Sequence, residues 1–204
     1  MRGSYQRKFC IQNLNLRKSI TFAGRLDMPV LQPYSEEPPE RLIPFHVARS
    51  SSDIEAGVHF FIDDYQFERI WQSPARYLEM LKRFRVVIGP DFSQFADIPA
   101  ALCIWQNFRG KYLSAWWQSE GVRVIPNVTW STPASYAYCF DGHPRNSVIA
   151  IHSQGVKSSS LSTYLWRKGY EEAVRRLKPS LILRYGEIML VKTKKSVFII
   201  LIII

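Results

Sequence analysis

The feature that most constrains the fold of this chain is a repeated alternation between short apolar runs and longer amphipathic segments. The runs begin at intervals of roughly 25 to 36 residues, which is the spacing of successive strand–helix units. The five runs that we interpret as strands are 57–65, 85–93, 122–130, 146–155 and 180–186. Nearly continuous apolar strands joined by helix-length crossovers are typical of a parallel sheet buried on both faces. The sequence therefore predicts an α/β fold.

The segments between the apolar runs carry helical patterns. Residues 66–84 have apolar side chains at helical spacing, with Pro74 as a break or as the first turn of a new helix. Residues 98–121 form a second helical segment, which Gly110 is expected to bend, and residues 158–179 open with capping serines. Five such units are too few for a complete eight-fold barrel. We predict a mostly parallel sheet of about five strands, either open or a partial barrel.

The two ends of the chain differ from this pattern. Residues 1–55 contain a Pro-rich stretch and no alternation, so we expect an irregular N-terminal arm or cap laid on an α/β domain of residues 56–187. Residues 188–204 form an atypical apolar tail, which we interpret as a truncated or frame-shifted end. This tail is too short to span a membrane and lacks the alternation of a docked strand. We expect it to add little stability.

Charge and cysteine content limit the partners and the compartment. The chain has 27 Lys and Arg against 17 Asp and Glu, and a net charge of +10 favours an acidic partner such as nucleic acid or a nucleotide. The basic residues are spread along the chain, so a solvated basic surface is an equal alternative. Its three cysteines are far apart and show no metal-binding spacing. Together with the lack of a signal sequence, this predicts a cytoplasmic protein.

Polar residues follow the predicted strands, and in parallel α/β folds ligands bind at the carboxyl ends of the strands. If the strands are parallel, these side chains converge on one rim. The rim candidates are Asp63, Asp64, Asp91, Ser93, Asn127, Thr129, His152, Ser153, Arg184, Tyr185 and Glu187.

Carboxylates beside a histidine suit metal-assisted phosphoester chemistry, in which acids hold a divalent cation and the imidazole transfers a proton. The candidate catalytic residues are Asp63, Asp64, Asp91 and His152. Each also has a simpler interpretation. Asp91 follows Gly-Pro and suits a turn, either of the two earlier aspartates can cap a helix, and His152 can be a core histidine.

A candidate phosphate-binding loop lies between a predicted strand and the helix that follows it. It contains Gly155, Lys157 and Ser158, and the free N–H groups and dipole of a helix N-terminus favour an anion. The spacing of a Walker A loop is absent. Simple serine capping of the helix is the alternative.

Aromatic residues are abundant in the central third of the chain and suggest base stacking. Seven of them are Trp105, Tyr112, Trp116, Trp117, Trp130, Tyr136 and Tyr138. Interleaved Arg109, Lys111 and Arg123 would hold phosphates in such a surface. The helical spacing of the aromatics is explained more simply by a buried core.

A family resemblance rests on the segments "IPFHVAR", "GVHFFIDDYQFERIW", "VVIGPDFSQF" and "VIAIHSQG", and above all on "GPDFS" and "RVIPNVTW". With these segments the chain resembles a family of bacterial and phage proteins, the domain of unknown function numbered 4417, over residues 40–187. The resemblance implies a bacterial, phage or other mobile-element origin and a cytosolic protein. It implies no activity, cofactor or catalytic residue.

Three classes of function stay open. The first is a metal-dependent phosphoesterase or nuclease, the second a nucleic-acid or nucleotide accessory protein of a mobile element, and the third a structural or partner-binding protein. The first class requires the rim side chains to lie together. The deciding observation is whether Asp91, Asn127 and His152 share a pocket.

Overall fold

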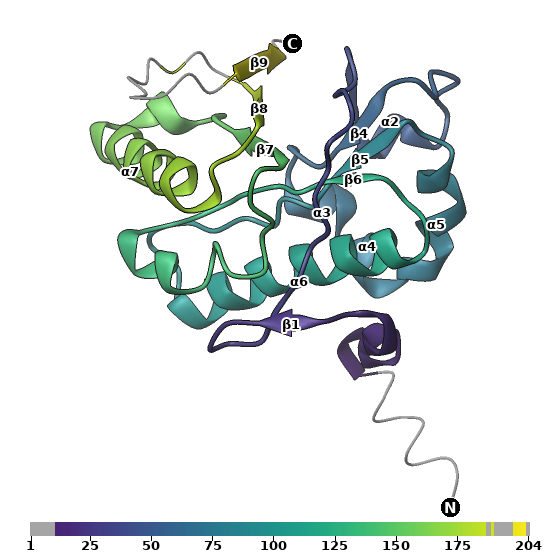
Figure 1. Ribbon diagram of the computed structural model, residues 1–204, viewed down its shortest axis with the longest axis horizontal. Coiled ribbons are helices and arrows are strands. Elements are labelled where there is room, and N and C mark those ends of the chain that lie inside the picture. The colour runs from purple at the N-terminus through teal and green to yellow at the C-terminus, as the bar shows by residue number, and fades with distance from the viewer. Residues whose placement is uncertain (1–10, 187–188, 190–197, 203–204) are drawn as a thin grey trace, which may run out of the picture.

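The computed structural model describes residues 11–186, 189 and 198–202 and confirms the α/β fold (Figure 1). The strands are β1 (Phe22–Ala23), β2 (Met28–Pro29), β3 (Leu42–Pro44), β4 (Gly57–His59), β5 (Val86–Ile88), β6 (Val124–Ile125), β7 (Val148–His152), β8 (Leu181–Tyr185) and β9 (Phe198–Ile202). The α-helices are α2 (Phe45–Ala48), α3 (Asp64–Phe67), α4 (Arg69–Gln72), α5 (Pro74–Lys82), α6 (Ala100–Ser119) and α7 (Ser160–Leu177). Three 3-10 helices are η1 (Ile11–Ser19), η2 (Pro133–Ala137) and η3 (Val156–Ser158).

The main sheet is parallel and its strands follow one another in chain order. Strands β3, β4, β5 and β6 pair successively, and so do β7, β8 and β9. A parallel bridge between Asn127 and Ala150 joins the two groups. In a doubly wound sheet the strand order reverses, whereas in a βα barrel it is sequential. The order therefore favours the partial barrel over the open sheet.

Both faces of the sheet are buried. Successive residues of a strand point to opposite faces, so β5 sends Val86 and Ile88 into one core and Val87 into another. The first core also contains Ile125, Val148, Ala150, Leu183 and Tyr185 from the neighbouring strands. The second contains Val58 and Val124 together with apolar residues of the helices. Burial on two faces explains why the strands are apolar at nearly every position.

Helices cover the outer face, with α6 running below the strands and α7 beside β7 and β8 (Figure 1). Helix α6 continues without interruption through Gly110. A Cβ at that glycine would lie 2.8 Å from the carbonyl oxygen of Pro90, so the residue permits close packing under the turn after β5. The helical pattern of residues 66–84 is divided among three short helices, and Pro74 begins the last of them.

The N-terminal region packs mainly on α6 and contributes one strand to the sheet. Tyr112 of α6 donates its hydroxyl to the carbonyl of Asn13 at 2.9 Å. Farther along, the carbonyl of Tyr34 accepts from Val148 N at 2.8 Å, at the start of β7. Strand β3 also lies in this region and pairs with β4. The parallel sheet therefore begins before residue 56.

The tail differs from the sequence-based expectation. Its residues Phe198–Ile202 form β9, which pairs with β8 in parallel over five residues. An edge strand forms backbone hydrogen bonds with one neighbouring strand only. Such pairing depends on the backbone, so a strand can form here although the sequence shows no apolar–polar alternation. Residues 187–188, 190–197 and 203–204, including Glu187, lie outside the described residues. In the part of the chain that the structure covers, no helix is both long and apolar enough to cross a membrane.

Candidate functional site

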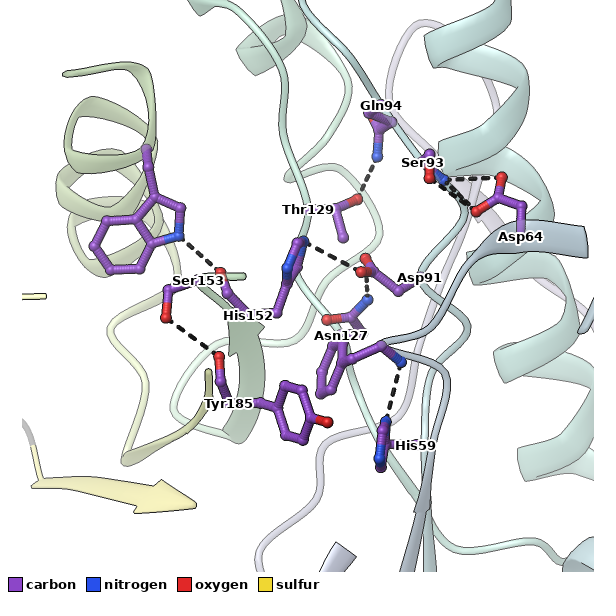
Figure 2. A network of polar contacts seen from close by, with 12 residues as sticks. His59, Asp64, Asp91, Ser93, Gln94, Asn127, Thr129, His152, Ser153 and Tyr185 are labelled. Atoms are coloured by element: carbon purple, nitrogen blue, oxygen red, sulfur yellow. Dashed lines mark hydrogen bonds and ion pairs between the residues drawn. The ribbon is translucent and has the colours of Figure 1, made fainter. Parts of the chain in front are cut away.

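Three of the predicted rim residues meet at the carboxyl ends of adjacent strands. Asp91 follows β5, Asn127 follows β6 and His152 ends β7. Asn127 Nδ2 donates to Asp91 Oδ1 at 2.9 Å, and His152 Nε2 lies 3.2 Å from Asp91 Oδ2 (Figure 2). The Asp91 side chain is only 10% exposed, whereas that of His152 is 34% exposed. Asp91 thus contacts side chains from the next two strand ends, which a simple turn former would not require.

Local packing explains how these residues come together. A Cβ at Gly89 would lie 3.2 Å from the backbone nitrogen of Asn127, so glycine allows the end of β5 to approach the end of β6. The proline that follows ends the strand and turns the chain toward the rim. On the other side, Trp166 of α7 donates its indole N–H to the carbonyl of His152 at 2.7 Å. The helix therefore holds the end of β7.

The Nε2 atom of the His152 ring faces Asp91. A carboxylate only accepts hydrogen bonds, so this contact suits a ring that carries hydrogen on Nε2. The other ring nitrogen, Nδ1, is buried and has no hydrogen-bond partner among the described residues. Several other buried polar atoms of the chain also have no partner among the described residues, so this feature supports a site only together with the pocket beside it.

A cluster of aromatic rings packs against His152. The ring centroids of Phe61 and Tyr185 are 4.8 Å apart, those of Phe61 and His152 5.6 Å apart, and those of His59 and Tyr185 4.6 Å apart. His59 Nδ1 accepts from Phe61 N at 3.1 Å, and burial lowers the pKa of His59 to about 4. Sequence reasoning did not select His59 or Phe61. The available signal was a histidine at the last position of a buried strand.

A pocket of about 330 Å³ opens beside Asp91 and His152. This volume is at the lower end of the range for small-molecule sites. Polar groups of the pocket include Ser93, Gln94 and Thr129, and aromatic groups include Phe95, Trp130 and Trp166. Gln94 Nε2 donates to Thr129 Oγ1 across the pocket (Figure 2). No Lys or Arg is among the described residues of the lining, so the carboxylate and the histidine dominate its charge.

The predicted phosphate loop forms one side of this pocket. Gly155, which has a positive φ of 68°, and Ser158 both line it, whereas Lys157 does not. The capping interpretation holds for the next serine, because Ser159 Oγ accepts from Ser162 N at 3.0 Å at the start of α7. The loop therefore brings both a helix N-terminus and small side chains to the pocket.

Asp91 and His152 share this pocket, whereas Asn127 and the remaining described candidates do not line it. Ser153 is buried and donates its hydroxyl to the carbonyl of Tyr185 at 3.2 Å. Asp63 is exposed, and Asp64 contacts Ser93 instead of the pocket. Arg184 precedes Tyr185 and points to the opposite face, where its Nη1 donates to the carbonyl of Met189 at 2.8 Å.

The structure corrects part of the prediction that basic residues hold phosphates beside stacked bases. Lys111 is buried and donates to three backbone carbonyls, those of Tyr138, Cys139 and Asp141. Arg109 is also buried, with its guanidinium 3.9 Å from the centroid of the Phe92 ring. Their burial makes this assignment wrong for both residues. Among the seven aromatics selected from the sequence, Trp130 lines the pocket, and Trp166 joins it from α7.

The donor set at the rim resembles an acid–base pair more than a metal centre built by the protein alone. Among the described residues, no group of three or more His, Cys, Asp and Glu side chains is placed to hold a metal ion. Both carboxylate oxygens of Asp91 already contact Asn127 and His152. The arrangement can orient an imidazole and stabilise its charge when it takes up a proton.

Comparison with known proteins places this site in a family. The family described as Domain of unknown function (DUF4417) matches residues 20–202, which include every residue of the site. This chain belongs to the DUF4417 family. It is 37% identical to the "Gene 1 protein" of Mycobacterium phage L5 over 178 residues, which are 86% of this chain and 77% of the relative. It is 36% identical to the "Gene 1 protein" of Mycobacterium phage D29 over 179 residues, or 86% and 66% of the two chains. No solved structure matches the DUF4417 chain.

Proposed function

We propose that this DUF4417 protein binds a nucleotide, or the end of a nucleic-acid chain, and hydrolyses a phosphoester bond with His152 as the proton-transfer group. One observation carries this proposal. The Asp91–His152 pair, held by Asn127, stands at the edge of a ligand-sized pocket at the carboxyl ends of parallel strands.

In this proposal Asp91 and His152 have different roles. Asp91 contacts Nε2 of His152 and orients the ring. Nδ1 is buried in this arrangement, so the proposal requires the ring to turn toward the pocket before Nδ1 takes a proton from an attacking water. The carboxylate then stabilises the imidazolium. As the phosphorus–oxygen bond breaks, the imidazolium returns this proton to the leaving oxygen. Water is the co-reactant, and each proton is accounted for.

The walls of the pocket support a nucleotide as the ligand class. Trp130, Trp166 and Phe95 offer faces for a base, and every base can stack on an aromatic ring. Gly155 and Ser158 lie beside the N-terminus of α7, where amide groups and the helix dipole favour phosphate. Both carboxylate oxygens of Asp91 contact Asn127 and His152, so a divalent cation would have to enter with the substrate phosphates and be held mainly by them.

The test pairs stability with binding and turnover for Asp91→Asn and His152→Ala. We expect the free energy of unfolding of both variants to lie within about 1 kcal/mol of the wild-type value, because both substituted residues lie outside the apolar cores. We expect both to lose nucleotide binding in calorimetric titrations with and without Mg²⁺ or Mn²⁺, and to lose phosphate release from a nucleotide panel. Asp97→Asn, an exposed acid in the same loop, is the matched control and should behave as the wild type. Wild-type binding and turnover in both site variants would reject the pocket as the site.

A non-enzymatic nucleic-acid-binding role is the second candidate, favoured by the net charge of +10. Its affinity for single-stranded DNA should fall steeply with salt through counterion release, and Asp91→Asn should leave that affinity unchanged. Equal retention of heparin would indicate only a charged surface. Lack of any binding at low ionic strength would eliminate this role.

A further inference from the structure

Asp64, the first residue of α3, binds the loop that carries Asp91. Its carboxylate accepts the backbone N–H of Ser93 at 3.1 and 3.2 Å and the Ser93 hydroxyl at 2.8 Å. Gln106 Nε2 of α6 donates to Asp64 Oδ2 at 3.2 Å. Figure 2 shows Asp64 and Ser93 on the side of Asp91 that lies away from His152. Asp64 therefore ties the end of β4 to the loop after β5.

The ionised form of Asp64 is costly, and the structure compensates for only part of that cost. Burial raises the pKa of Asp64, hydrogen bonds from Ser93 lower it, the Asp91 carboxylate raises it and Arg109 lowers it. The net direction is upward. A half-buried acid kept beside a second carboxylate is the kind of arrangement found near functional sites.

The residue between Asp91 and Ser93 is held by the same two helices. Phe92 is buried, and its ring centroid is 5.0 Å from that of Phe67 of α3. The guanidinium of Arg109, from α6, lies 3.9 Å from the centroid of the Phe92 ring. It also forms an ion pair with Glu68, the residue between α3 and α4. Residues of α3 and α6 thus pack against the loop immediately after Asp91. Asn127 donates a hydrogen bond to the Asp91 carboxylate itself.

We propose that Asp64 is a positioning residue, which through Ser93 holds the Asp91 carboxylate against His152. Asp64 is not among the residues that line the pocket, so it acts through the loop and not on the ligand. This inference rests on the proposed role of the Asp91–His152 pair. Its readout, however, is the geometry of that pair, which can be measured without any ligand.

The experiment follows the His152 Nε2–H signal by NMR in the full chain labelled with ¹⁵N-histidine, with the signal assigned by its loss in His152→Ala. Asp91→Asn should move the signal upfield or remove it, because the carboxylate acceptor is gone. We expect Asp64→Asn and Ser93→Ala to shift it in the same direction and to speed its exchange with water. Asp63→Asn, the adjacent exposed acid, is the matched control and should leave the signal unchanged.

Unchanged His152 signals in folded Asp64→Asn and Ser93→Ala would overturn the proposal. If Asp64→Asn does not fold, Ser93→Ala decides, since it keeps the carboxylate and the backbone hydrogen bond. Loss of nucleotide turnover in Asp64→Asn with a wild-type signal would also overturn it, because Asp64 would then act on the ligand directly. Full binding and turnover in Asp91→Asn would reject the proposed function. The effect of Asp64 and Ser93 on the His152 signal would stay valid in that case.

Discussion

At the scale of single residues, burial and partners give two histidines of this rim different roles. His59 is 1% exposed and uses Nδ1 to accept a backbone N–H, so its ring is neutral and structural. His152 is partly exposed, faces a carboxylate and keeps a nitrogen without a partner. The same side chain is therefore part of the core in one position and faces a carboxylate beside a pocket in the other.

His59 should make the fold sensitive to acid. Its pKa is about 4 in the folded chain and about 6.5 when unfolded, so protons bind the unfolded state more readily. The free energy of unfolding should fall as pH decreases from 6.5 to 4, by at most about 3 kcal/mol. His59→Asn, whose Oδ1 can still accept from Phe61 N, should reduce this pH dependence in urea titrations, while the part that comes from buried His143 stays.

The control for this prediction is His46→Asn. His46 lowers the pKa of His59 less than burial does, so its removal should reduce the pH dependence only slightly. Identical pH profiles for the wild type and His59→Asn would contradict the assignment of the acid sensitivity to His59.

At the scale of elements, α6 links the core to the site. Its apolar side chains pack against the sheet, its Gln106 reaches Asp64 and its Gly110 lies under Pro90, the residue before Asp91. The position of α6 therefore limits how closely the turn after β5 approaches the helix. Close approach is possible only because the helix presents a glycine at the contact.

Gly110→Ala should destabilise the protein although alanine favours helix by roughly 1 kcal/mol. The new Cβ would meet the Pro90 carbonyl oxygen at 2.8 Å, and backbone cannot rotate away as a side chain can. We expect a lower free energy of unfolding in urea and a displaced Asp91. Ala101→Gly, at an exposed position of the same helix, measures the propensity effect alone. A more stable Gly110→Ala variant would show that α6 is not tightly packed there.

At the scale of the whole molecule, the described residues form a four-stranded and a three-stranded parallel sheet in chain order, joined by the Asn127–Ala150 bridge, with an apolar core on one face and helices on the other. In such an arrangement, the carboxyl ends of neighbouring strands lie side by side at one rim. This explains how residues more than 30 positions apart in sequence, such as Asp91 and Asn127, come into hydrogen-bonding contact. The last strand, β9, pairs with β8 at the edge of this sheet.

Truncation after Gly186 should lower the melting temperature, because it removes β9 and leaves the edge of β8 unpaired over five residues. We expect a loss of more than about 1 kcal/mol in the free energy of unfolding, the size that distinguishes a structural effect from a neutral surface change. Deleting only residues 203 and 204 is the control and should have little effect. An unchanged melting temperature after the longer truncation would support the original interpretation of a dispensable tail.

The sequence by itself determined the class of fold and which strand ends bring Asp91, Asn127 and His152 together. Apolar runs such as Val86–Ile88, separated by helix-length segments, are stable only as parallel strands buried on both faces. Chain direction then places the residues after each strand at one rim, which is why Asp91, Asn127 and His152 could be selected together. These inferences depend on local pattern and on the geometry of the parallel crossover, and both can be read without coordinates.

Only the tertiary structure decided which polar residues share a face and which partners they have. Arg184 and Tyr185 are neighbours in sequence, yet Arg184 contacts Met189 on one face of the sheet and Tyr185 packs in the core on the other. Asp63 and Asp64 likewise differ, because only the second lies against Ser93. Trp166 reaches the pocket only because α7 packs beside β7. Strand register, helix packing and sheet curvature depend on contacts between distant segments, and a pattern of neighbouring residues carries no information on those contacts.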